Sequence, residues 1–109
     1  MNRVVLIGRL TREVELQFTP NGHPVARFGM AVPGRQTHEV NFVEVVAWRR
    51  LAELCAEHLG KGQMVGVSGR LSIRKYETES GSPKRMTEVI AEDVRFLEKR
   101  TSGSVSQTL

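Results

Sequence analysis

The chain has 109 residues, with 16 Lys and Arg against 12 Asp and Glu, a net charge of +4 and a sequence pI of about 9.8. This length predicts one domain and excludes a chain of several domains. The excess of positive charge suits a polyanionic partner, although an Arg-leaning proteome would give the same balance. No stretch approaches the length of a membrane span, and no signal peptide is visible because Arg3, Arg9 and Arg12 break up the apolar start, so we expect a soluble, cytoplasmic protein.

The first third of the chain predicts strands joined by turns. Residues 3–10 are rich in β-branched side chains and are interrupted by Gly8, as in a bent barrel strand. The Thr-Pro-Asn-Gly sequence at 19–22 predicts a turn, and residues 25–32 after it alternate in polarity like a strand. One face of that strand combines small residues with Arg27, which fits either plain solvent exposure or the approach of something flat.

A strand at 42–48 and the helix that follows it organise the rest of the chain. The strand is largely apolar on both faces, so one face should meet the core and the other must be covered or used. Residues 49–59 predict the only convincing helix, because Leu51, Leu54, Cys55, His58 and Leu59 recur at helical period. Gly60 and Gly62 are the expected end signals.

The stretch from 64 to 76 alternates strictly and predicts a long strand. Its expected inward set is Val65, Val67, Gly69, Leu71 and Ile73, and its outward set is Ser68, Arg70, Ser72, Arg74 and Tyr76. A turn at 79–84 and a last strand at 85–97 follow. Strands on both sides of a single helix predict an all-β domain, a β-barrel with one helix, over residues 1–98, and a short disordered tail at 99–109.

Enzyme chemistry finds little support in the sequence. The nearest approach to a nucleophile elbow, at 66–70, has its second glycine one place early and lies inside a strand. There is no phosphate-binding loop and no dinucleotide fingerprint. Cys55 and His58 lack the further ligands of a structural zinc site and are expected to be packing residues, so we expect no catalytic residue, no metal and no cofactor.

Large aromatic residues interleaved with bases point instead to nucleic acid. Phe42 and Trp48 share one face of their strand, and Tyr76 follows Arg70 and Arg74 on one face of another. Single-stranded nucleic acid is bound by such surfaces, because bases stack on aromatic rings while Arg and Lys follow the phosphates. A lone aromatic would more often be a core residue, but three with bases between them favour binding.

These residues also carry a family resemblance. The chain closely resembles bacterial single-stranded DNA-binding proteins of the OB-fold, homotetrameric type, over about residues 1–97. The matching segments are 2–10 (NRVVLIGRL), 20–22 (PNG), 25–28 (VARF), 45–53 (VVAWRRLAE), 61–62 (KG), 69–71 (GRL) and 87–89 (TEV). The resemblance implies a five-stranded Greek-key barrel and sequence-independent binding of single-stranded DNA during replication, recombination and repair.

The resemblance also implies roles for individual residues. Phe42, Trp48 and Tyr76 fall on the family's base-stacking positions, and Arg3, Arg50, Lys61 and Arg74 fall on or beside its phosphate-contacting ones. With the bases that the strand pattern itself places on outer faces, the candidate nucleic-acid-binding set is Phe42, Trp48, Tyr76, Arg3, Arg9, Arg27, Arg50, Lys61, Arg70 and Arg74.

Three features depart from the family pattern. The connection at 33–41 is shorter and carries no aromatic, so a further stacking position is missing. Glu44 lies on the face of Phe42 and Trp48, where a carboxylate would repel phosphate. The chain ends in Ser106–Leu109 rather than the family's acidic Pro-Phe tip, so we do not expect that route of recruiting replication and repair proteins.

Val43, Val45 and Val46 give more apolar β surface than one helix can cover, which predicts a symmetric homo-oligomer, a tetramer by the family resemblance.

The alternative function is an oligomeric OB-fold adaptor of a replication-restart (primosome) complex that binds mainly protein, or a protein that binds RNA. The ladder at Arg70 and Arg74 favours nucleic acid, because protein-binding faces are depleted of charge at their centre.

Overall fold

The computed structural model describes residues 1–99. The expected tail therefore lies, from residue 100 onward, outside the described residues. The elements are β1 (Val4–Leu10), β2 (Glu15–Phe18), β3 (Pro24–Pro33), β4 (Val40–Trp48), α1 (Arg49–His58), β5 (Met64–Glu77) and β6 (Pro83–Phe96). No helix in this part of the chain is long and apolar enough to cross a membrane.

The strands form one sheet that closes on itself. Its order is β1-β5-β6-β4-β3-β2, and β1 also pairs with β3 through Arg9 with Ala31 and Leu10 with Met30, so five strands make a ring. All ladders are antiparallel except that between β4 and β6, where Val45 pairs with Val89. The predicted five-stranded barrel is confirmed. The sixth strand, β2, was not predicted. Within residues 1–99 it pairs only with β3 and lies at the edge of the sheet.

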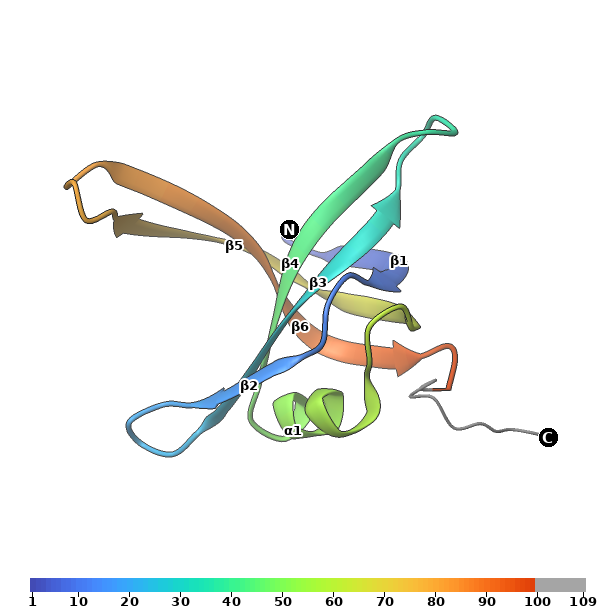
Figure 1. Cartoon of the computed structure of the whole chain (residues 1–109), viewed down its shortest axis with the longest axis horizontal. Helices are drawn as coiled ribbons and strands as arrows, with labels where there is room; N and C mark the ends of the chain where they lie inside the picture. Colours follow the sequence, from blue (N-terminus) through green and yellow to red (C-terminus); the bar gives the residue numbers. More distant parts are fainter. Residues whose placement is uncertain (100–109) are drawn as a thin grey trace.

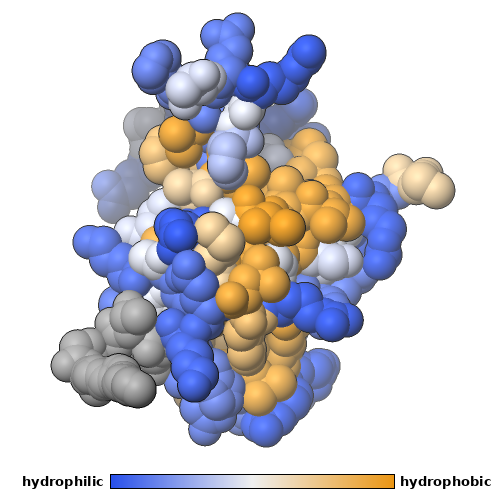
Figure 2. Space-filling model, turned by 90° about the vertical axis from the view of Figure 1, so that its right-hand side faces the viewer, coloured by the Kyte–Doolittle hydropathy of each residue, from blue (hydrophilic) through white to orange (hydrophobic). Residues whose placement is uncertain are grey.

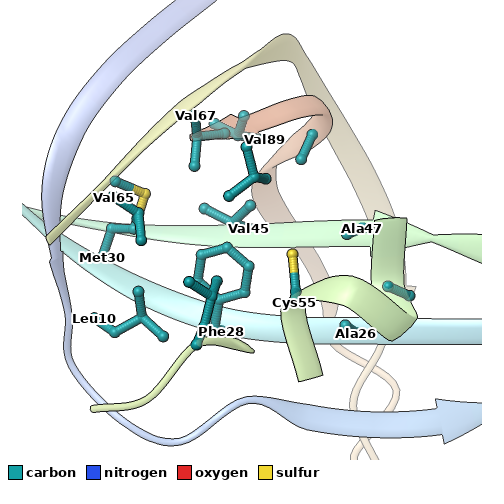
Figure 3. Close-up of a cluster of buried hydrophobic side chains, with 14 residues drawn as sticks. Leu10, Ala26, Phe28, Met30, Val45, Ala47, Cys55, Val65, Val67 and Val89 are labelled. Atoms are coloured by element: carbon teal, nitrogen blue, oxygen red, sulfur yellow. The ribbon is translucent and has the colours of Figure 1, made fainter. Parts of the chain in front are cut away.

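The barrel is filled by apolar side chains from every strand of the ring and by the helix. Phe28 and Met30 of β3 meet Val45 of β4 and Val65 of β5 in the interior (Figure 3). Cys55 points from α1 into this cluster, as predicted, and burial raises the pKa of its thiol to about 12. The thiol therefore behaves as a small apolar core group.

The helix lies at one end of the barrel (Figure 1). It begins directly after β4 with Arg49 in a left-handed conformation (φ 59°), and it ends where the Leu59 amide donates to the Cys55 carbonyl. Gly62, with φ 86°, makes the turn into β5. His58, which the sequence placed on the buried stripe, is half exposed and packs its ring against Phe96 at 5.6 Å between centroids.

Two long hairpins, β3–β4 and β5–β6, extend beyond the barrel and diverge (Figure 1). The predicted inward positions of Leu71 and Ile73 are wrong, because β5 at these residues has left the barrel and both side chains are exposed. A register irregularity at Ser68 and Gly69 marks the change, and a Cβ on Gly69 would collide with the Ile90 carbonyl. Gly69 is thus required for the close approach of β6.

Candidate nucleic-acid interface

The outer face of β4 carries two of the three candidate stacking residues. Phe42 and Trp48 are both exposed, while Val45 and Ala47 on the other face are fully buried. This is the alternation that the sequence predicted. Trp48 is also the residue before the first turn of α1, in an extended conformation, so the strand-to-helix junction fixes its backbone.

The third candidate, Tyr76, lies on the other hairpin. It is exposed on β5 opposite Lys84 of β6, near the end of the arm. Figure 1 shows that the β3–β4 and β5–β6 hairpins diverge from a common base, so Phe42 and Tyr76 belong to two separate arms above one barrel. The three aromatics are therefore spread over the molecule and do not form a single cluster.

Candidate bases occupy the sheet between these arms. Arg27 on β3 pairs with Val46, Val46 with Ile90 on β6, and Ile90 with Arg70 on β5. Cross-strand partners point to the same side of a sheet, so this row brings Arg27 and Arg70 onto the face of Trp48. Arg70 is exposed.

A buried carboxylate holds two of the arginines together. Glu88 of β6 is only 3% exposed. It accepts a hydrogen bond from Arg27 Nη1 at 2.6 Å and bonds from Arg74 Nε and Nη2 at 3.4 and 3.3 Å. Burial by itself would raise the pKa of Glu88, but the hydrogen bonds and charges of Arg74 and Arg27 outweigh it and leave the pKa below its ordinary value. One negative charge thus fixes two positive ones on the outer face.

A second carboxylate on this face is also paired. Glu44 lies on the outer side of β4 with Phe42 and Trp48, as the sequence placed it, and accepts hydrogen bonds from Arg12. Sequence reasoning missed both Arg12 and Glu88 as part of the site. For Arg12 the available signal was Glu44, a carboxylate between two valines on a predicted strand, because such a residue needs a cationic partner when buried.

The remaining candidate bases lie farther from the aromatics. Arg3 contacts Ser68 Oγ and Glu92, and Arg50 on α1 pairs with Glu53. Arg9 donates to the Gly62 carbonyl and to Glu98, both at 2.9 Å, which holds its guanidinium toward the turn that contains the exposed Lys61. The structure therefore brings Arg27, Arg70 and Arg74 together and leaves Arg3, Arg9, Arg50 and Lys61 around the rim.

A comparison with known proteins decides the family. The model of the single-strand binding protein family matches residues 1–97. The chain belongs to this family. One relative is the single-stranded DNA-binding protein of Clostridium tetani, which is 46% identical over 95% of this chain and 77% of the relative. Another is single-stranded DNA-binding protein A of Bacillus subtilis, which is 48% identical over 94% of this chain and 63% of the relative. The chain thus spans less than two thirds of the length of the Bacillus subtilis relative.

A solved structure of the same family has the same fold. It is described as the Plasmodium falciparum SSB complex with ssDNA, and it matches 90% of this chain and 96% of its own with a TM-score of 0.79 and 31% identity. The single-strand binding fold was therefore correctly predicted from the sequence, and the OB-fold barrel described above is that of the family.

Proposed function

We propose that this protein binds single-stranded DNA without sequence preference and protects it during replication, recombination and repair. Bases stack on Phe42, Trp48 and Tyr76, and Arg and Lys side chains contact the phosphates. The observation that carries the proposal is the exposure of three large aromatics, Trp48 at the barrel and Phe42 and Tyr76 on the two arms, with Arg27, Arg70 and Arg74 on the sheet between them. The relatives named for single-stranded DNA binding support the choice of ligand.

The chemistry of this surface accounts for binding that ignores sequence. Every base offers a flat π face, and each stacked base contributes about 1–3 kcal/mol. Each guanidinium carries five N–H donors, and Glu88 accepts bonds from only some of those of Arg27 and Arg74. The remaining donors can bind phosphate oxygens. Neither contact depends on the edges of the bases that distinguish one from another.

The same proposal covers the remaining biological roles. The protein acts without catalysis, assembles as a homotetramer, and works in the cytoplasm on single strands exposed in the nucleoid. The set of phosphate-contacting residues comprises Arg3, Arg9, Arg27, Arg50, Lys61, Arg70 and Arg74. Recruitment through an acidic tip concerns residues outside the described part of the chain.

A fluorescence titration tests this function directly. Trp48 is the chain's one tryptophan, so its emission reports on the proposed stacking position alone. We expect quenching by homopolymeric DNA single strands of any base and much weaker binding of duplex, with a negative log-log salt slope of about 0.7 per contacted phosphate. Preference for one short sequence, for RNA or for duplex, or a flat salt response, would contradict the proposal.

The DNA affinity of alanine variants, measured with a label on the DNA, tests the stacking residues. Trp48→Ala and Tyr76→Ala should each weaken binding by about 1–3 kcal/mol with little change in melting temperature. The matched control is Phe96→Ala, because Phe96 has the same exposed fraction as Trp48, 43%, but lies beside His58 at the far end of β6. Loss of stability with unaltered binding per folded molecule would assign Trp48 and Tyr76 to the fold instead.

A further inference from the structure

The acidic residue Glu44 lies in the middle of the proposed DNA-binding face. It is two residues from Phe42 and four from Trp48 on the same side of β4. Its side chain is 22% exposed, so water screens its charge only partly. A bare carboxylate at this position would repel a phosphate backbone that runs from one aromatic ring to the next.

Arg12 covers this carboxylate with a two-pronged contact. Its Nη2 lies 2.6 Å from Oε2 of Glu44 and its Nη1 lies 3.3 Å from Oε1. Such fork-shaped pairs are the strong and orienting form of an arginine–carboxylate contact. Arg12 comes from the loop after β1, so it reaches Glu44 from a segment 32 residues earlier in the chain.

A glycine on the strand between them makes the reach possible. Gly29 of β3 is the cross-strand partner of Glu44, and its carbonyl accepts a bond from the Thr11 amide at 2.9 Å. A Cβ at Gly29 would lie 2.7 Å from Arg12 Nη1 and 2.5 Å from Thr11 Oγ1. The arginine therefore crosses β3 directly over a position without a side chain, and the loop is anchored at the same residue.

We propose that Arg12 is a further DNA-contacting residue, which covers Glu44 and presents a phosphate-binding cation between Phe42 and Trp48. This inference rests on the proposed function. The pairing occupies an N–H on each terminal nitrogen, and the Arg12 side chain remains 40% exposed, so other donors can reach a phosphate oxygen. Without Arg12 the same spot would carry an uncompensated negative charge.

The test is a cycle of variants on the full chain, with binding of oligo(dT) measured by fluorescence anisotropy. Arg12→Gln should weaken binding about tenfold, because it removes a cation and uncovers an anion. Glu44→Gln should bind as tightly as the unaltered protein or tighter, and the double variant should recover to within about threefold of it. Arg95→Gln is the matched control, because Arg95 is an equally charged residue paired with Asp93 at 2.8 Å on the far part of β6, and it should change binding by less than about twofold.

The cycle separates the inference from the function on which it rests. If the unaltered protein does not bind oligo(dT), the proposed function fails. If it binds, but Arg12→Gln behaves like Arg95→Gln, or Glu44→Gln does not restore binding to Arg12→Gln, the inference fails and the function stands. Melting curves and light scattering on each variant test whether folding and assembly are unchanged. Should Arg12→Gln alone unfold, the double variant is compared with Glu44→Gln, because position 44 carries no charge in either and Glu15, which lies 3.9 Å from Arg12 in the unaltered protein, is present in both. Weaker binding by the double variant shows that Arg12 contacts DNA, and equal binding shows that it does not.

Discussion

Glu88 is buried, and a buried charge costs free energy of folding unless it is fully paired. Its oxygens accept hydrogen bonds from Arg27 of β3 and Arg74 of β5, the two strands that flank the β4–β6 pair in the sheet. Removal of one partner from a buried charge pair costs more than the pair contributes, because the other charge is left without compensation. The same ion cluster therefore stabilises the fold and holds two arginines at the proposed interface.

The lowered pKa of Glu88 predicts how stability depends on pH. A carboxyl group whose pKa is lower in the folded state than its ordinary value of 4.5 stabilises the fold above that value, and this contribution is lost as the pH falls below it. Glu88→Gln should lower the free energy of unfolding by about 1–3 kcal/mol at pH 7 and should flatten the loss between about pH 5 and 3. Urea unfolding at a series of pH values measures both effects, and parallel acid profiles for the two proteins would contradict the assignment.

Side-chain direction on single strands could be predicted, whereas contacts between distant segments could not. The exposure of Phe42, Trp48 and Tyr76 follows from alternation, which is a local property. The pairs Arg12–Glu44 and Arg27–Glu88 join residues 32 and 61 positions apart, and local periodicity carries no information about them. Their formation depends on strand order, which could be predicted only from the family resemblance.

At the scale of elements, the β5–β6 hairpin is where periodicity misleads. Alternation correctly assigns Leu71 and Ile73 to the face of Val65 and Val67, but it does not tell where the strand leaves the barrel. The face that is interior at Val67 is open to solvent at Ile73. The arm is thus held mainly by its own ladder of cross-strand pairs, from Arg70 with Ile90 to Glu77 with Pro83.

This difference predicts unequal costs for similar substitutions. Ile73→Ala should change the free energy of unfolding by no more than about 0.5 kcal/mol, as at other surface positions. Met30→Ala, at a fully buried site in the barrel, should cost about 2–5 kcal/mol because it removes apolar contacts and leaves a cavity. Denaturant unfolding of both variants provides the comparison, and a large loss from Ile73→Ala would mean that another surface covers the arm.

At the scale of the whole molecule, the residues predicted to drive oligomerisation, Val43, Val45 and Val46, are the wrong ones. Val45 and Val46 are buried within the chain itself, and Val43 is partly buried against the core, so these valines do not form an open apolar surface. The exposed apolar residues lie instead on β1, where Val5 and Ile7 point outward, and Figure 2, which looks onto the side of Figure 1 where β1 is labelled, shows apolar side chains gathered there. Within residues 1–99 the ladder from β1 to β3 involves only Arg9 and Leu10, and Gly8 lies against Ala31 of β3, so Val4 to Ile7 present a strand edge on that side.

An edge strand with exposed apolar side chains can pair with the same strand of a second copy about a two-fold axis, which satisfies the backbone groups of both. The proposed homo-oligomer should therefore depend on β1. Ile7→Lys should lower the mass measured by light scattering toward that of the 12.2 kDa chain, because two copies of the charge would meet across the axis. Ile73→Lys is the matched control, since Ile73 has nearly the same exposed fraction as Ile7, 56% against 55%, but lies on the β5–β6 arm. Equal masses for the two variants, or a fall in mass with Ile73→Lys alone, would place the contact between copies away from β1.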